Sequence, residues 1–212
     1  MSQNVPAPPE PFEPLEEIIK RDALLFRVFT VAAGRGALSF NPGYGSVTRF
    51  GFFGQPRVPI LYAADSLEAA VCETLLHDVP VEGGQLLTTN VDRSAAAGIR
   101  PTRNLRLAKF HGTGLRRLKV TQAQLTDTPP TKYDRTVRWA EAAYSAGFDG
   151  ISWMSAKCNT DRAFVLFGGD RVATEDLRID REHGHIFLAG ADREWLIEFC
   201  ATLHIDVSAP VR

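Results

Sequence analysis

The sequence lacks the long apolar runs of membrane proteins, since no stretch approaches the roughly 20 residues needed to span a bilayer. Its three cysteines, Cys72, Cys158 and Cys200, form no zinc-binding or disulfide pattern, which predicts a protein of the reducing cytoplasm. An excess of either charge is also missing, because 24 Lys and Arg face 25 Asp and Glu. The net charge of −1 argues against a protein that binds duplex DNA or an anionic membrane over its whole surface.

Several motifs of nucleotide-binding proteins and hydrolases are missing as well. No Gly-Lys-Ser/Thr occurs, which excludes a P-loop, and there is no GxSxG nucleophile elbow. The glycine-rich stretch GYGSVTRFGFFG lacks the strand and helix that flank a Rossmann GxGxxG motif. His183 and His185 form an isolated H-x-H pair, and two ligands do not make a metal site. We therefore expect no metal.

The length of 212 residues fits one domain with appendages. Apolar residues make up 44% of the chain and charged residues 23%, as in ordinary soluble globular proteins. Residues 1–14 contain five prolines and no apolar stretch, so they are predicted to form a Pro-rich arm rather than a secretory signal.

The apolar pattern predicts more strands than helices, without regular alternation between them, which favours an α+β fold over a doubly wound sheet. One helix, 66–78, is predicted to be capped by Asp65, with Glu68 completing a variant of the capping box. The predicted strands are 24–31, 59–65, 84–92, 104–109, 115–120, 148–154, 162–169 and 171–179, and the other predicted helices are 15–22, about 132–147 and 190–203.

A basic segment, residues 100–119, holds seven Lys and Arg and no acid. One interpretation is a surface for phosphate or RNA, and the other is a pair of strands whose charges face water. Phe110 is the one aromatic residue in this segment, which weakens the case for stacking on nucleic-acid bases.

Four polar residues stand out as candidates for a site. Arg27 interrupts the apolar strand LFRVF, where its charge needs an anion or a route to solvent. Glu73 lies off the apolar stripe of helix 66–78, and a pair with His77 at i,i+4 is the simpler interpretation. Tyr62 ends the strand before that helix. Ser155 lies in a polar turn between two apolar strands, a position that ordinary turn chemistry also explains.

In this order the segments resemble the RES domain family, which is named for its Arg, Glu and Ser. The matching pieces are an Arg in an early strand, an R-[WF] element, the segment ILYAADSLEAAVCETLL, and G-I-x-[YW]-x-S followed by an apolar strand. The resemblance covers roughly residues 20–170. It assigns Arg27, Glu73 and Ser155 as the naming trio, with Ser152 as an alternative serine, and adds Tyr62, Arg49 and Phe50.

The resemblance implies a fold similar to ADP-ribosyltransferase toxins, with a split twisted sheet and flanking helices. It implies a RES domain at 15–170 and a C-terminal extension at 171–212, a strand plus a helix packed on the domain. Members of the family break the bond between nicotinamide and ribose in NAD, with water, phosphate or a protein as acceptor. Many are toxins paired with an Xre-type antitoxin that covers the active site, and a homo-oligomer is a further expectation.

The candidate residues suit that chemistry. Nicotinamide leaves NAD as a neutral molecule, so the barrier lies in the cationic ribosyl group rather than in protonation of the leaving group. Glu73 is expected to stabilise that cation or to hold the ribose 2′-hydroxyl, while Arg27 and Arg49 clamp the pyrophosphate. Tyr62 and Phe50 are expected to stack on the bases, and Ser155 to bond the nicotinamide ribose.

The sequence therefore predicts an NAD glycohydrolase or phosphorylase, for which NAD is the substrate. The alternatives are an ADP-ribosyltransferase that modifies a protein and, with less support, an RNA-binding module.

Overall fold

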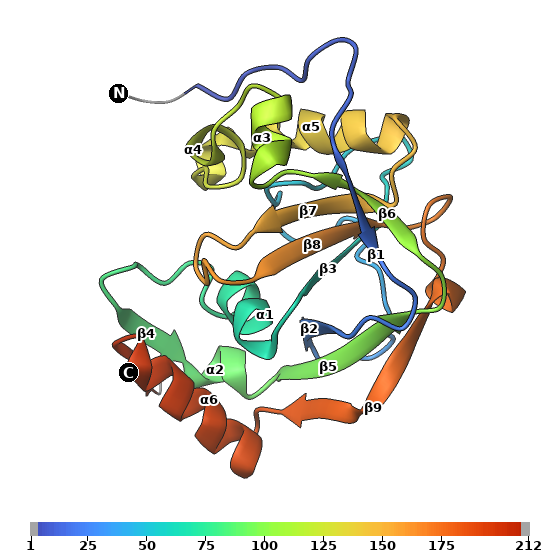
Figure 1. Ribbon diagram of the computed structural model, residues 1–212. Helices are drawn as coiled ribbons and strands as arrows, with labels where there is room; N and C mark the ends of the chain where they lie inside the picture. Colours follow the sequence, from blue (N-terminus) through green and yellow to red (C-terminus); the bar gives the residue numbers. More distant parts are fainter. Residues whose placement is uncertain (1–3, 209–212) are drawn as a thin grey trace.

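The computed structural model describes residues 4–208 and shows an α+β fold around one curled sheet (Figure 1). Its strands are β1 (Glu16–Ile19), β2 (Leu25–Thr30), β3 (Ile60–Ala64), β4 (Gly84–Leu87), β5 (Ser94–Pro101), β6 (Leu105–Lys109), β7 (Gly150–Met154), β8 (Arg162–Phe167), β9 (Leu177–Ile186) and β10 (Ile205–Ser208). Within the described range, eight of them form the sheet in the order β1-β6-β7-β8-β3-β2-β5-β9. Its neighbouring strands are antiparallel except β6 and β7, while β10 and β4 form a separate parallel pair.

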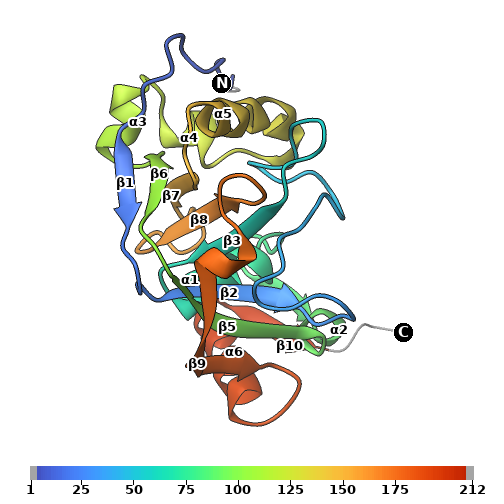
Figure 2. The same ribbon diagram turned by 90° about the vertical axis from the view of Figure 1, so that its right-hand side faces the viewer.

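Helices lie at two ends of this sheet, as Figures 1 and 2 show. At one end are α3, α4 and α5, at the other are α2 and α6, and α1 lies between them. The helices are α1 (Leu67–Thr74), α2 (Thr88–Val91), α3 (Thr113–Arg117), α4 (Gln122–Leu125), α5 (Tyr133–Ser145) and α6 (Ala191–Thr202), with 3-10 turns at Pro130–Lys132 and Thr174–Asp176. None of the helices in residues 4–208 is long and apolar enough to cross a membrane.

The sheet is nearly divided in two between β2 and β3. A single residue pair, Phe26 with Ala64, joins these strands, whereas β2 pairs with β5 over six residues. Strands β2 and β3 therefore separate beyond this pair, and the two parts of the sheet diverge there. This arrangement confirms the predicted α+β class and its split, twisted sheet.

The central strands are apolar on both faces because both faces are covered. All residues of β8 after Arg162 are buried, and β7 is buried over Gly150–Trp153. On one face Trp153 belongs to an aromatic cluster with Phe110 and with Trp139 of α5. The long apolar runs of these two strands are why sequence analysis located them correctly.

The N-terminal arm packs on the domain over α5. Val5 is buried, Trp139 Nε1 donates a hydrogen bond of 2.9 Å to the carbonyl of Pro6, and the ring of Phe12 meets Trp139 edge-on. The arm therefore covers an indole that would otherwise lack a hydrogen-bond acceptor.

Two predicted elements have the wrong type. Residues 15–22 were expected to be helical, but Glu16–Ile19 forms β1, because pairing with β6 overrides the local helical preference. Residues 115–120 were expected to be a strand, but residues 115–117 form the second half of α3, and Leu118 is its C-cap; both Leu115 and Leu118 are buried. Gly114 permits this helix to form, since a Cβ there would lie 2.1 Å from the carbonyl oxygen of Lys109.

Other boundaries differ from the predictions. The expected strand 84–92 ends at Leu87, where α2 begins, and the expected strand 171–179 starts only at Leu177 and continues to Ile186. Strand β5 was not predicted at all, because its SAAAG segment has little strand propensity. Small residues are needed there, since a Cβ on Gly98 would lie 2.7 Å from that of His183 on β9.

Candidate active site

A cavity of about 790 Å³ is walled by β2, β3, α1, the segment between β2 and β3, and the start of α5. Arg27 comes from β2 and Tyr62 from β3, while α1 supplies Glu73 and the intervening segment supplies Arg49. The structure therefore brings four of the predicted site residues to one cavity. Its volume lies within the range of small-molecule sites.

Arg27 is fixed by the segment that covers the cavity. Its two terminal nitrogens donate hydrogen bonds of 2.7 Å to the carbonyl oxygens of Ala37 and Ser39. Burial lowers the pKa of the Arg27 guanidinium to about 10, which still leaves it charged at neutral pH. Within residues 4–208 it forms no ion pair with a carboxylate, so its positive charge is not cancelled. Neither edge-strand exposure nor a carboxylate explains its place in an apolar strand.

Arg49 is held in a similar way on another wall. It donates a hydrogen bond of 3.3 Å to the carbonyl of Thr128, and its guanidinium lies 5.6 Å from the ring centre of Tyr133. In the described part of the chain it also lacks an ion pair with an acid. Two cationic groups thus line one cavity without a carboxylate partner.

Tyr62 presents a neutral phenol to the cavity. Its hydroxyl shares a hydrogen bond of 2.8 Å with Thr48 Oγ1, and its ring meets Trp153 edge-on at 6.0 Å. Burial raises the pKa of Tyr62 to about 12, so the phenol stays protonated at neutral pH. It can offer a ligand an aromatic face or a hydroxyl, but no charge.

Glu73 and Ser155 are in direct contact. Ser155 Oγ donates a hydrogen bond of 2.6 Å to Glu73 Oε1 and accepts one of 3.1 Å from the amide of Cys158. Because the serine oxygen accepts from that amide, its proton is directed at the carboxylate. Glu73 Oε2 has no hydrogen-bond partner among the described residues. The carboxylate is therefore oriented by one oxygen while the other remains available to a ligand.

The alternative pairing of Glu73 with His77 is wrong. Helix α1 ends at Thr74 rather than at residue 78, so the two side chains do not lie one turn apart. His77 Nε2 instead shares a hydrogen bond of 3.2 Å with Tyr133 OH.

The cap of α1 also differs from the prediction. Ser66 caps the helix by accepting a hydrogen bond from the amide of Ala69, whereas the Asp65 carboxylate binds Arg162.

Three predicted residues, Phe50, Ser152 and Ser155, lie away from the cavity wall. Phe50 is fully buried, and its ring packs edge-on against Phe110 and Trp153, so it has no free face for a base. Ser152 is fully buried within β7, while Ser155, three residues on, is the serine that contacts Glu73. Ser155 is itself buried and reaches the cavity through that contact.

Sequence analysis missed several aromatic residues of the cavity, among them Tyr44 and Tyr133. Tyr44, in the segment between β2 and β3, lies under the guanidinium of Arg35 at 4.5 Å, and Tyr133 lies under Arg49. The glycine-rich surroundings of Tyr44 were a usable signal of an irregular functional segment. Tyr133 gave no such signal in the sequence, because its position at the cavity depends on where α5 begins. No cluster of His, Cys, Asp or Glu in residues 4–208 could hold a metal ion.

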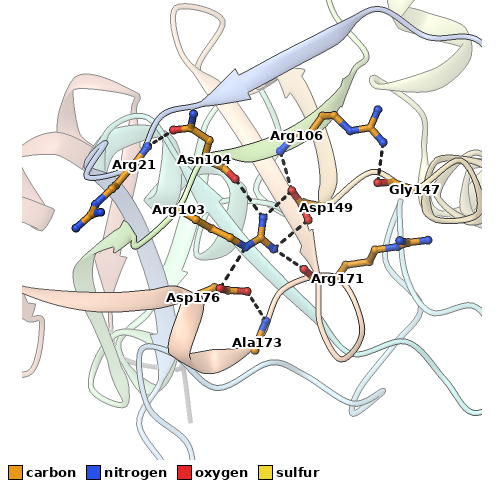
Figure 3. Close-up of polar contacts among 9 residues, drawn as sticks. All are labelled: Arg21, Arg103, Asn104, Arg106, Gly147, Asp149, Arg171, Ala173 and Asp176. Atoms are coloured by element: carbon orange, nitrogen blue, oxygen red, sulfur yellow. Dashed lines mark hydrogen bonds and ion pairs between the residues drawn. The ribbon is translucent and has the colours of Figure 1, made fainter.

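The basic segment 100–119 lies in a different environment. Arg103 makes two hydrogen bonds of 3.1 Å to Asp149 and an ion pair of 3.2 Å with Asp176, as Figure 3 shows. Arg100, Arg106 and Arg117 pair with Asp180, Glu16 and Glu13, respectively. Carboxylates from distant parts of the chain therefore neutralise four of the basic side chains. This counts against an RNA surface, and α3 also replaces the second strand of the expected pair.

Comparisons with known proteins bear on the fold and on the family of the chain. No curated protein matches the chain. A solved chain from the crystal structure of the M. tuberculosis MbcT–MbcA toxin–antitoxin complex is similar, with 16% sequence identity and a TM-score of 0.53. The match covers 77% of this chain and 84% of that chain. The likeness is one of fold, the ADP-ribosyltransferase-like fold expected from the sequence.

A family model matches a similar share of the chain. The RES domain matches residues 24–188, which include Arg27, Tyr62, Glu73 and Ser155. The chain therefore belongs to the RES domain family.

Proposed function

We propose that this protein is an NAD-consuming enzyme that cleaves the bond between nicotinamide and ribose, and that it is the toxin of a toxin–antitoxin pair. The observation that carries the proposal is the Glu73 carboxylate, oriented by Ser155 at 2.6 Å in a cavity that also holds two uncompensated arginines. Membership of the RES domain family supports the same activity.

The reaction needs a stabiliser of positive charge more than it needs an acid. When the glycosidic bond breaks, the electron pair stays with nicotinamide, which departs neutral, and the ribosyl carbon becomes cationic. A carboxylate that is already oriented lowers the energy of that cation without reorganising. Glu73 fits this role, because Ser155 holds Oε1 and leaves Oε2 for the ribose. The cation is then captured by water or by inorganic phosphate, giving ADP-ribose or its 1″-phosphate.

The other residues of the cavity suit the remainder of NAD. Arg27 and Arg49 supply positive charge for the two phosphates of the dinucleotide. The neutral ring of Tyr62 gives a surface for stacking on a base, and it carries no negative charge that would repel the phosphates. The side chain of Phe50 is not part of this proposal, because it is buried elsewhere.

A partner protein belongs to the proposal as well. The solved structure with a similar fold is a toxin–antitoxin complex, and an Xre-type antitoxin that covers the cavity is the corresponding partner here. Expression of the chain alone in a bacterium is expected to lower cellular NAD and arrest growth, and co-expression of the antitoxin to restore both. Normal growth with an unchanged NAD level would contradict the toxin role.

A second candidate uses the same residues. The exposed side chains Tyr44 and Val47 at the cavity are compatible with a protein acceptor, to which ADP-ribose would be transferred. The products distinguish the two. Purified protein incubated with NAD labelled in its ADP-ribose part is expected to release nicotinamide together with free ADP-ribose or, with phosphate present, its 1″-phosphate. Transfer would instead attach the labelled ADP-ribose to a protein.

The substitution Glu73→Gln tests the central residue. The variant is expected to fold and bind NAD, but to release nicotinamide about 10²–10³-fold more slowly, the usual effect of removing one electrostatic stabiliser. Glu68→Gln is the matched control, since Glu68 lies on the same helix but does not line the cavity. Turnover close to wild type in folded Glu73→Gln would remove Glu73 from the mechanism.

A further inference from the structure

The contact between Glu73 and Ser155 joins two segments that leave the sheet at the same place. Helix α1 follows β3, and the turn that carries Ser155 leads into β8. Strands β3 and β8 are antiparallel neighbours, with Ala64 at the end of β3 paired to Ala163 at the start of β8. The residues next to this pair, Asp65 and Arg162, therefore lie side by side at the base of both segments.

These two residues form a clamp of four hydrogen bonds. Asp65 Oδ2 accepts from the amide and Nε of Arg162 at 3.1 and 2.7 Å, and Asp65 Oδ1 accepts from a terminal nitrogen at 2.9 Å. In return the amide of Asp65 donates to the carbonyl of Arg162 at 3.0 Å. The remaining terminal nitrogen of Arg162 bonds Glu17 on β1 at 2.8 Å. Every nitrogen of the guanidinium is therefore engaged, which fixes its plane.

The clamp is continuous with the site on both sides. Ser66, directly after Asp65, caps α1, the helix that bears Glu73. Asp161, directly before Arg162, accepts a hydrogen bond of 3.0 Å from the amide of Ser155. A shift of either segment relative to the other would therefore have to break hydrogen bonds between Asp65 and Arg162.

We propose that Asp65 and Arg162 are positioning residues that set the distance between Glu73 and Ser155. The inference rests on the proposed function, because it concerns the carboxylate of that site. Neither residue lines the cavity, so both act through the Ser155–Glu73 hydrogen bond. Loss of the clamp lets the turn and the helix move apart, and a displacement of about 1 Å at a reacting group costs on the order of 10²-fold in rate.

The Arg103–Asp149 pair provides a matched control for a merely structural role. Like Arg162 and Asp65, its arginine and aspartate share two side-chain hydrogen bonds, and the side-chain exposures are 38% and 14% against 34% and 25% for Arg162 and Asp65. Figure 3 shows the pair. Asp149 precedes β7, at the opposite end of that strand from Ser155, and neither member lines the cavity.

The test compares Asp65→Asn with Asp149→Asn. Asp65→Asn is expected to lower kcat about 10–100-fold with KM for NAD within about threefold of wild type, because binding groups are untouched. Asp149→Asn is expected to lose a similar amount of stability and to keep kcat within about twofold. An equal fall in kcat in both variants would overturn the proposal. If Asp65→Asn does not fold, Arg162→Lys replaces it, and the same split between kcat and KM is required.

A double-mutant cycle with Ser155→Ala identifies the route of the effect. If Asp65 acts through Ser155, the double variant is expected to have a kcat within about twofold of that of Ser155→Ala alone. Full additivity of the two losses would overturn the proposal.

Failure of the proposed function is distinguishable from failure of this inference. If the wild-type protein releases no nicotinamide, the proposed function is wrong, and hydrogen exchange still tests the clamp. The amide of Cys158 donates to Ser155 Oγ, so its exchange is expected to be at least about tenfold faster in Asp65→Asn than in Asp149→Asn, at matched global stability. Equal exchange in the two variants would contradict the positioning role.

Discussion

Arginines meet different partners in two regions of the molecule. In the cavity, Arg27 and Arg49 donate to backbone carbonyls of Ala37, Ser39 and Thr128. Around Asp149, Arg103 meets two carboxylates. A carbonyl dipole holds a guanidinium in place but leaves its full charge, whereas a carboxylate cancels it. The arginines of the cavity therefore keep their positive charge, whereas those around Asp149 are neutralised by ion pairs.

This difference separates two interpretations that the sequence could not separate. The basic segment 100–119 has the greater density of positive charge along the chain, yet its arginines are largely paired. Arg27, a single charge in an apolar strand, forms no ion pair with a carboxylate among the described residues, and neither does Arg49. Local charge density is therefore a poor guide to a binding surface when acids from distant segments return to it.

The largest expected effect is that of Arg27→Ala on the affinity for NAD. Loss of hydrogen bonds from a charged donor is expected to weaken binding about 10–100-fold. Calorimetry in a Glu73→Gln background measures the dissociation constant without consuming the ligand. An unchanged constant would show that Arg27 only anchors the segment above it and binds no phosphate.

Arg103→Ala is expected to do the reverse. The affinity for NAD stays unchanged, but the free energy of unfolding falls by about 1–3 kcal/mol, because the largely buried carboxylate of Asp149 loses two hydrogen bonds. Urea denaturation measures the loss, and the same calorimetry provides the control. A matching drop in affinity would mean that the two regions are not independent.

Acid is expected to lower the stability of the fold through Glu17, a paired carboxylate outside the cavity, at a pH where the cavity arginines do not titrate. Burial alone would raise the pKa of Glu17, but hydrogen bonds from His111 and Arg162 outweigh it and hold the value at about 2. Because the unfolded chain has the ordinary pKa near 4.5, this group stabilises the fold fully above that pH, and the contribution is lost as the pH falls toward 2. The urea midpoint of Glu17→Gln is therefore expected to depend less on pH between 6 and 3 than that of wild type. Parallel curves would contradict this.

The parts of the fold that could be predicted are those fixed by local pattern. Strand 148–154 and helix α5, with Gly147 at a positive φ just beyond its end, follow from apolar runs and cap chemistry. What failed depends on contacts far along the chain. Strand β1 exists because β6 pairs with it, and β5 uses small residues for the approach of β9.

The same division holds for the candidate site. Family resemblance located Arg27, Tyr62, Glu73 and Arg49, which the fold brings to one cavity. Phe50 matched the pattern but is buried in the core, because a sequence motif does not say which way a side chain turns. Contacts such as Tyr133 with Arg49 join segments about 80 residues apart, and no local signal reveals them.

The packing of α1 sets when the site can be completed during synthesis. The buried face of α1, with Val71 and Cys72, shares one apolar cluster with Leu196 and Cys200 of α6 and Ile205 of β10. The ribosome adds the residues of α6 and β10 well over a hundred positions after Glu73. Helix α1 therefore gains this part of its packing only after α6 and β10 have been synthesised, so a nascent fragment that ends before α6 carries Glu73 without that support.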